Sequence, residues 1–203
     1  MIAVAIGNGE SRAGVNLNKF KKDHVLVGCN ALHRDIVVDH LVCCDRRMIE
    51  ESLSSNNTYN TEIYVRNDWL NFYSKQDSRI KQVPQLPYEG NTKADMPIHW
   101  GSGPYAVLVA ATLSVDTVML LGFDLYSKDQ NFNNVYKDTK HYKSKESSPV
   151  DHSFWEYQIA KVFENFPNKN FVILNDNEWI LPTSWNRPNV VMKVLATKNL
   201  TSV

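Results

Sequence analysis

The chain has 203 residues, and its 22 basic side chains are balanced by 22 acidic ones, so the formal net charge is zero at pH 7. This balance gives no bulk electrostatic attraction to nucleic acid or to an anionic membrane. Hydrophobic residues make up 43% of the chain and aromatic residues 11%, which suffices for a sizeable core and excludes a disordered chain. We therefore expect one domain over residues 1–203.

The cellular compartment is indicated by two further features. No run of about 18 apolar residues could span a bilayer, and Met1 leads directly into a strand-like segment instead of the basic start of a signal peptide. We therefore expect a cytoplasmic protein without a transmembrane segment. Cys29, Cys43 and Cys44 lie inside apolar runs and lack C-x-x-C spacing, so we interpret them as buried, reduced thiols.

Short apolar runs alternate with helix-forming stretches over the first half of the chain. The predicted strands cover residues 2–6, 24–29, 41–44 and 61–65, and the predicted helices cover residues 46–53 and 68–73. The first two runs are rich in β-branched residues, which favours strands. Because strands and helices alternate, we expect an α/β fold: a single Rossmann-like domain with a mainly parallel central sheet flanked by helices.

The second half of the chain begins with a proline-rich loop over residues 84–97. Pro104 suits the first turn of a helix, and the small and apolar residues that follow, as far as Leu113, predict a helix that is buried on most of its surface. Residues 117–122 form the most continuous apolar run of the chain, which predicts a strand in the middle of the sheet.

A long polar segment separates this strand from the last elements. Residues 127–149 show neither helical nor strand periodicity, so we interpret them as a lid-like or partly disordered segment within the domain. A helix is predicted from residue 150 to residue 165, followed by a strand at 171–174 and an edge strand at 190–195.

A glycine-rich turn, Gly7-Asn8-Gly9, directly follows the first predicted strand. Such a turn presents backbone N–H groups at the carboxyl edge of the sheet, where phosphate groups can bind. The dinucleotide fingerprint requires a third glycine where Arg12 stands and an acidic residue where Asn30 stands, so NAD binding is disfavoured. The alternative is a structural turn without a ligand.

A second candidate, Gly101-Ser102-Gly103, precedes Pro104 at the start of the predicted buried helix. The first amides of a helix have no intrahelical acceptor and carry the positive end of the helix dipole, so they can bind an anion. The alternative is that Ser102 only caps the helix. Because both glycine motifs are expected at one edge of the sheet, together they favour a nucleotide site.

Four further side chains are candidates at this edge. Asp124 follows the central strand but has no second acidic residue two positions away, which does not support a metal site. Tyr126 and Tyr136 flank the start of the polar segment, where phenols can donate to phosphate oxygens; surface tyrosines are the alternative. His152 begins a predicted helix and is suited to removing a hydroxyl proton, whereas a solvated or capping histidine is the alternative.

The order of these motifs resembles that in the bacterial sialyltransferases that use CMP-sialic acid to decorate lipooligosaccharide. The segments that carry the resemblance are Ala5-Ile6-Gly7-Asn8-Gly9-Glu10-Ser11, Val27-Gly28-Cys29-Asn30, Gly101-Ser102-Gly103-Pro104-Tyr105-Ala106 and Leu120-Leu121-Gly122-Phe123-Asp124-Leu125-Tyr126. The family pattern is strand-GNGPS, strand-xCN, TSG-helix and strand-GxDFY, followed by a lid and a catalytic histidine that opens a helix.

The resemblance implies a metal-independent glycosyltransferase with a nucleotide-binding α/β fold, no cofactor and a lid over its donor. Such an enzyme transfers sialic acid, or a related nonulosonic acid, from a CMP-activated donor to a glycan hydroxyl with inversion. By resemblance His152 is the general base, and Tyr126 and Tyr136 hydrogen-bond the departing phosphate. The residues expected to bind the donor are Gly7, Asn8, Gly9, Asn30, Asp45, Gly101, Ser102, Gly103 and Asp124.

The partners implied are a nucleotide-sugar donor, a glycan acceptor through which the protein would associate with a membrane surface, and further copies of the chain in a homotetramer. Two positions depart from the family pattern: Asp45 replaces an asparagine, and His99 occupies the approximate place of an arginine. These departures keep a non-catalytic nucleotide- or glycan-binding protein as an alternative. A second family, linked to flagellin glycosylation and pterin pyrophosphokinase activity, shares the GNG and GxD features, so a pyrophosphokinase-like transferase is another alternative.

Overall fold

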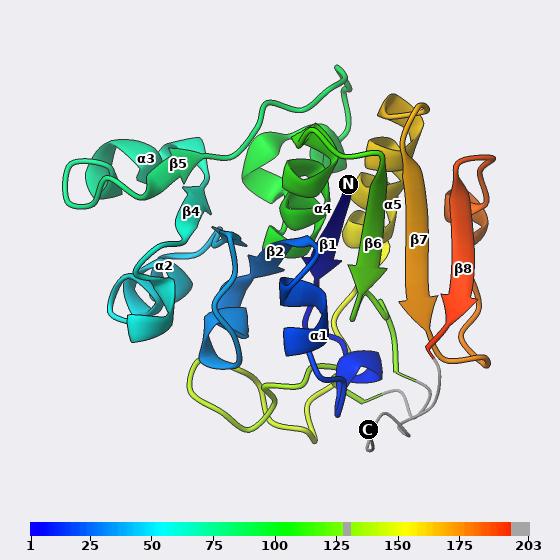
Figure 1. The fold of residues 1–203 in the computed structure, drawn as a ribbon, viewed down its shortest axis with the longest axis horizontal. Helices are drawn as coiled ribbons and strands as arrows, with labels where there is room; N and C mark the ends of the chain where they lie inside the picture. The colour runs from blue at the N-terminus through cyan, green and yellow to red at the C-terminus, as the bar shows by residue number, and fades with distance from the viewer. Residues whose placement is uncertain (128–130, 196–203) are drawn as a thin grey trace.

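The chain folds around one eight-stranded sheet in which all neighbouring strands are parallel, in the order β5-β4-β3-β2-β1-β6-β7-β8 (Figure 1). The computed structural model describes residues 1–127 and 131–195. Helices flank the sheet, so the fold is Rossmann-like and the predicted α/β class is confirmed. Every strand pair is parallel, including the one at the edge formed by β8.

The predicted elements are present, with ends that differ from the prediction by a few residues. The strands are β1 (Ile2–Ile6), β2 (Val25–Cys29), β3 (His40–Val42), β4 (Glu62–Val65), β5 (Ile80–Gln82), β6 (Thr117–Leu121), β7 (Asn170–Asn175) and β8 (Val190–Val194). The α-helices are α1 (Asn18–Lys21), α2 (Arg46–Leu53), α3 (Asn67–Tyr73), α4 (Ser102–Thr112) and α5 (Ser153–Asn165). Strand β5 was not predicted, because Ile80 is the one apolar residue among its three. No helix in the described ranges has the length and hydropathy of a membrane span.

Different helices cover the two faces of the sheet. Helices α4 and α5 pack on one face, against inward side chains such as Ala3, Val118 and Phe171. Helices α1 and α2 lie on the other face, where Val4 and Leu41 belong to a second core cluster. The division follows the alternation of side chains along each strand. Nine of the eleven residues of α4 are buried, which confirms the predicted burial of this helix.

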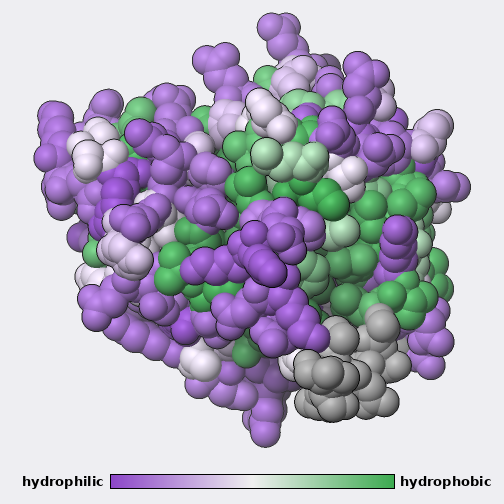
Figure 2. Space-filling view, in the orientation of Figure 1, coloured by the Kyte–Doolittle hydropathy of each residue, from purple (hydrophilic) through white to green (hydrophobic). Residues whose placement is uncertain are grey.

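One part of the sheet has an exposed apolar face. In Figure 1, α1 lies in front of the central strands, whereas no described helix lies in front of β7 and β8. Figure 2 shows hydrophobic side chains gathered over this part of the molecule. Met119 and Leu174 are only partly buried here, and Val191 keeps 48% of its surface exposed. Parallel sheets usually have both faces covered, so this strip departs from the usual arrangement within the described residues.

The carboxyl ends of β1 and β6 meet at a topological switch point. Strand β2 pairs with one side of β1, and β6 pairs with the other side. The chain therefore continues from β1 to β2 in one direction along the sheet, and from β6 to β7 in the other direction. Open α/β sheets bind ligands in the crevice that forms at such a point. Residues 131–149, the described part of the predicted lid, cross beyond this edge at the bottom of Figure 1. Residues 128–130 of that segment lie outside the described residues.

Arg34 fastens the lid segment to the body of the domain. Its Nε and Nη2 atoms donate to both carboxylate oxygens of Glu51, at 2.6 and 2.8 Å. Its Nη1 donates to Thr139 Oγ1 at 2.9 Å, and its Nη2 donates to the Lys140 carbonyl oxygen at 3.0 Å. The guanidinium also lies over the ring of Tyr142. Residues 139–142 of the segment are therefore tied to the body of the domain.

Asp95 anchors the proline-rich loop between β5 and α4. Its carboxylate accepts hydrogen bonds from the Thr92 hydroxyl at 2.6 Å, the Thr92 amide at 2.8 Å and the Tyr157 hydroxyl at 2.8 Å. These donors, the Thr92 hydroxyl first, favour the charged form and hold the pKa of Asp95 at about 2. Because Tyr157 belongs to α5, the loop is tied to that helix.

Replacement of Asp95 by asparagine should reduce the acid sensitivity of the protein. The folded-state pKa lies below the ordinary value of 3.8, so the Asp95 carboxylate stabilises the fold above that value and loses this contribution as pH falls from 3.8 to about 2. The free energy of unfolding, measured by urea titration at several pH values, should therefore fall less steeply in Asp95→Asn over this interval. The control is Asp116→Asn, which alters a carboxylate that is 88% exposed. Equal slopes for the wild type and Asp95→Asn would contradict the anchoring role.

Candidate functional site

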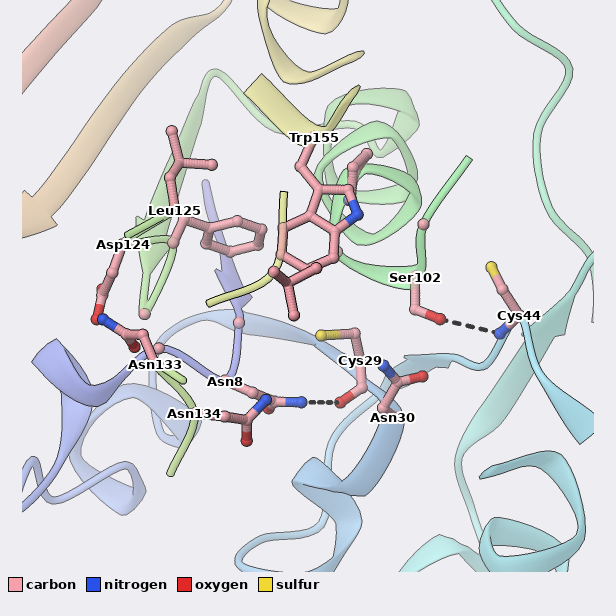
Figure 3. Close-up of a pocket in the computed structure, with 18 of the residues that line it drawn as sticks. Asn8, Cys29, Asn30, Cys44, Ser102, Asp124, Leu125, Asn133, Asn134 and Trp155 are labelled. Atoms are coloured by element: carbon pink, nitrogen blue, oxygen red, sulfur yellow. Dashed lines mark hydrogen bonds between the residues drawn. The ribbon is translucent and has the colours of Figure 1, made fainter. Parts of the chain in front are cut away.

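A pocket of about 460 Å³ opens at the switch point (Figure 3). Its walls come from the carboxyl ends of β1, β2, β3 and β6, the N-terminus of α4, the start of α5 and residues 131–134 of the lid. All of the predicted donor-binding residues line it: Gly7, Asn8, Gly9, Asn30, Asp45, Gly101, Ser102, Gly103 and Asp124. The fold thus brings both glycine motifs into a single site.

The turns that follow β1 and β6 cross in close contact. The amide of Gly7 donates to the Leu121 carbonyl oxygen, and that of Gly9 donates to the Gly122 carbonyl oxygen, both at 2.8 Å. A Cβ atom on Gly7 would overlap the Gly122 carbonyl group, and one on Gly9 would lie 2.5 Å from Asp124 Cγ. Glycine is therefore required at both positions for space. For Gly7 and Gly9 the expectation that the amides of this turn are free to bind phosphate is wrong, because the Leu121 and Gly122 carbonyl oxygens already accept from them.

Asp124 braces the first turn from within the core. Its carboxylate accepts from the Ser11 amide at 2.8 Å and the Ser11 hydroxyl at 2.5 Å, and Asn175 Nδ2 lies at 3.4 Å. Burial raises the pKa of Asp124, and the Ser11 donors oppose that shift. The side chain is thus an anchor between β6 and the first turn. Within the described ranges, no three His, Cys, Asp or Glu side chains are grouped as metal ligands.

Arg12, which stands at the third-glycine position of the dinucleotide fingerprint, holds the same turn from the other side. Its Nε donates to the Gly7 carbonyl oxygen at 2.8 Å, its Nη1 to Asp35 at 3.1 Å and its Nη2 to the Tyr136 hydroxyl at 2.8 Å. Tyr136 itself is buried, donates to Asp35 at 2.6 Å and does not line the pocket. The structure therefore gives Tyr136 a place in the scaffold, away from the expected leaving group.

The N-terminus of α4 supplies the free amides of the site. Gly101 occupies the N-cap position without a side-chain cap, so the alternative that Ser102 only caps this helix is wrong. The Ser102 hydroxyl instead accepts from the Cys44 amide at 2.9 Å and joins α4 to the end of β3. The amides of Ser102 and Gly103 have no protein acceptor in the part of the chain that is described. They can therefore donate to a bound anion.

Two asparagines that line the pocket have unsatisfied side-chain oxygens. The Oδ1 atoms of Asn8 and Asn30 are buried and have no hydrogen-bond partner among the described residues. Asn8 Nδ2 faces the Cys29 carbonyl oxygen at 3.4 Å, as Figure 3 shows. Asn30 adopts a positive φ of 50°, which asparagine tolerates better than most residues. A buried acceptor without a donor is costly, so a turn of either side-chain amide toward the cavity, where a ligand O–H or N–H group can donate to its oxygen, would be favourable.

Tyr126 lines the pocket on a strained turn. Its amide donates to the Asp124 carbonyl oxygen at 2.7 Å across Leu125, whose φ is 64°. Such a three-residue turn is rare for a residue other than glycine and costs about 1–3 kcal/mol. The Tyr126 hydroxyl accepts from the Ile180 amide at 3.1 Å, and the ring stacks on Trp179. The hydroxyl proton of Tyr126 can still be donated to a ligand.

His152 lies at the N-cap position of α5, beside the pocket and outside its lining. Its ring centroid is 6.1 Å from that of Tyr126. Val150 and Trp155, on either side of it in sequence, do line the pocket. The backbone therefore brings His152 to the rim, next to the one predicted tyrosine that faces the cavity.

The end of the pocket near β3 and β4 carries mixed charge that the sequence did not reveal. Asp45 caps α2 by accepting from the Met48 amide at 3.2 Å. Arg46 and Arg66 line the pocket beside it, whereas His99, the expected counterpart of a family arginine, is exposed and outside the lining. Arg46 is paired with Glu50 and Arg66 with Asp68, so guanidinium and carboxylate groups alternate at this end of the pocket. Arg46 and Arg66 follow β3 and β4, and parallel strands end at the same edge of the sheet. This position in the sequence could have indicated that both arginines lie at the site.

Aromatic side chains also line the pocket and were missed as well. They are Trp69, Trp100, Phe123, Phe132 and Trp155. Trp155 lies so close to the N-terminus of α4 that a Cβ atom on Gly101 would be 2.9 Å from its Nε1. Figure 3 shows the Trp155 indole across the cavity from Asn8 and Asn134. Such a wall can pack against a planar or apolar part of a ligand.

The cysteines behave as predicted: all three are free and buried. Cys29 and Cys44 line the pocket, and burial raises the pKa of each thiol to about 12. Burial also raises the pKa of Cys43. The thiols are therefore protonated at neutral pH and contribute to packing, since the thiolate is the reactive form.

Comparison of the chain with protein-family models finds no match. Searches of curated proteins and of solved structures find no match either. The resemblance to the sialyltransferases therefore stays a prediction that rests on the motif residues alone.

Replacement of Arg12 by leucine should destabilise the protein by about 3 kcal/mol, because it leaves the Gly7 carbonyl oxygen and the Tyr136 hydroxyl without their buried donor. The measurement is the free energy of unfolding from urea titration. Arg46→Leu is the matched control: its ion pair with Glu50 is exposed, so its loss should cost less than about 1 kcal/mol. A similar small cost for Arg12→Leu would show that the turn does not depend on this side chain.

Proposed function

We propose that this protein is a metal-independent, inverting glycosyltransferase. Its donor is a CMP-activated sialic acid or related nonulosonic acid, and its acceptor is a glycan hydroxyl. One observation carries the proposal: two complementary kinds of unsatisfied group line the same pocket. The Ser102 and Gly103 amides can donate to phosphate oxygens, whereas the side chains of Asn8 and Asn30 carry buried oxygens that lack a donor.

A cytidine nucleotide fits both requirements. Its phosphate oxygens accept hydrogen bonds at the N-terminus of α4, where the helix dipole favours negative charge. Its ribose hydroxyls and exocyclic amine can donate to the oxygens of Asn8 and Asn30. The aromatic wall that includes Trp155 offers a surface for the base. A protein of zero net charge can thus hold an anion through local donors.

Arg46 supports an acidic sugar. It lines this end of the pocket, and its Nε donates to Glu50 at 2.8 Å, which leaves its Nη groups for a ligand. The carboxylate of a nonulosonic acid would accept from these groups, since arginine recognises carboxylates through paired N–H groups. Arg46 would then serve in place of the absent family arginine.

In the proposed mechanism, His152 takes the proton from the acceptor hydroxyl as its oxygen attacks the anomeric carbon of the donor. The bond from that carbon to the phosphate oxygen breaks, and CMP leaves on the opposite face with inverted configuration. The amides of Ser102 and Gly103 and the hydroxyl of Tyr126 stabilise the charge that develops on the phosphate. Loss of one such donor typically costs about 3 kcal/mol of transition-state stabilisation. Tyr136 acts only through the scaffold that it forms with Arg12.

The second candidate is a non-catalytic nucleotide-binding protein. The observation that favours it is the position of His152 outside the pocket lining. Both candidates bind CMP, so they differ in turnover alone.

His152→Ala should reduce sugar transfer and slow donor hydrolysis by at least about 100-fold, because the general base is lost. Its affinity for CMP, measured by calorimetry, should stay within about twofold of that of the wild type. His99→Ala is the control, since His99 is exposed and outside the pocket. Release of CMP from CMP-sialic acid is the assay, with and without a chelator.

Three results would count against the assignment. CMP release by His152→Ala at the rate of the wild type would show that His152 is not the general base. Binding of CMP without turnover by the wild type favours the non-catalytic candidate. A strict requirement for Mg²⁺ favours the pyrophosphokinase-like alternative.

A further inference from the structure

A second concavity, of about 430 Å³, lies at the carboxyl ends of β4 and β5. We call it the β4–β5 groove. Its apolar lining consists of Val83, Pro84, Leu86, Pro97, Ile98 and Tyr105. Ile98 keeps 48% of its surface exposed, although it is a large aliphatic side chain. The groove is at the same edge of the sheet as the pocket at the switch point, where open α/β folds bind ligands.

Arg66 lines both the groove and the pocket, so the two are neighbours. Its Nε and Nη2 atoms donate to the Asp68 carboxylate at 3.0 and 2.9 Å. Its Nη1 donates to the Ile98 carbonyl oxygen at 2.9 Å. These bonds fix the guanidinium at the boundary and account for three of its five N–H groups. The remaining N–H groups can donate to a polar ligand atom that lies between the two cavities.

We propose that the β4–β5 groove binds the apolar aglycone of the acceptor glycoside. This inference rests on the proposed function, because a glycosyltransferase needs a second substrate beside its donor. The glycan portion of the acceptor runs from Arg66 through the pocket toward His152, and the hydrocarbon or aryl portion lies against Ile98 and Leu86. The occupant follows from two observations: the groove adjoins the pocket at Arg66, which lines both, and its lining is mainly apolar.

The charge at the boundary between groove and pocket supports a sugar at Arg66 and an apolar group beyond it. Arg66 is paired with Asp68, so the boundary is nearly neutral and does not favour a second strongly charged group. Sugar hydroxyls suit such a site, since they both donate and accept hydrogen bonds. Beyond the boundary, an apolar group that covers Ile98 removes exposed aliphatic surface from water, which favours binding in proportion to the area covered.

The test uses two probes that differ only in their apolar part, octyl β-galactoside below its micelle concentration and methyl β-galactoside. Calorimetry on the wild type should give at least about tenfold tighter binding of the octyl compound, which is about 1.4 kcal/mol. Ile98→Asn should reduce this preference to within about threefold. Met96→Asn is the matched control, because Met96 is 51% exposed on the same loop and does not line the groove. It should keep the preference of the wild type.

Binding of CMP by the same three proteins separates this inference from the proposed function. The expected result is unchanged CMP affinity in both variants, together with loss of the octyl preference in Ile98→Asn alone. Equal binding of the two galactosides by the wild type would overturn the proposal that the groove binds the aglycone. An octyl preference that survives in Ile98→Asn, or one that is lost equally in Met96→Asn, would overturn it too. If CMP does not bind while the octyl preference depends on Ile98, the proposed donor fails and the apolar site is supported.

Discussion

The contact between the turns that leave β1 and β6 is the constraint on which the pocket depends. The two strands are parallel neighbours, and two backbone hydrogen bonds, from Gly7 and Gly9, continue their pairing beyond the strand ends. Such a close approach leaves no room for a Cβ atom at either glycine. Asp124 and Arg12 then hold the first turn from its two sides. The floor of the pocket is therefore rigid backbone, braced by buried charged groups.

This constraint decides which groups remain for a ligand. Because the amides of Gly7 and Gly9 already donate to the Leu121 and Gly122 carbonyl oxygens, the amides of Ser102 and Gly103 at the start of α4 are the stronger candidates to bind an anion. The first turn instead contributes the side chain of Asn8, whose buried oxygen matches that of Asn30 on the next strand. Donors and acceptors thus lie on different elements of one site, which suits a ligand with both phosphate and hydroxyl groups. Strain at Leu125 is stored beside the same site, as is common where a fold holds a ligand.

Most of the fold could be predicted from the sequence, because apolar runs and their spacing decide which segments become strands of a parallel sheet. The pocket could be predicted as well, since residues that follow parallel strands meet at one edge. The role of each residue in the pocket could not be predicted from the sequence. The hydrogen bonds of Asp124 to Ser11 join residues 113 positions apart, and those of Arg12 depend on the packing of Tyr136 from the lid. The contribution of Arg66 was missed because it depends on how far β4 lies from the switch point, which sequence spacing does not give.

The central claim is that the N-terminus of α4 and the asparagines after β1 and β2 form one nucleotide site. The most direct measurement is a titration of the protein with CMP, followed by the amide NMR resonances of each residue. The claim predicts that the backbone amides of Ser102 and Gly103 and the side-chain amides of Asn8 and Asn30 shift together, with a single dissociation constant. Shifts at only one of these two groups, or at neither, would contradict it.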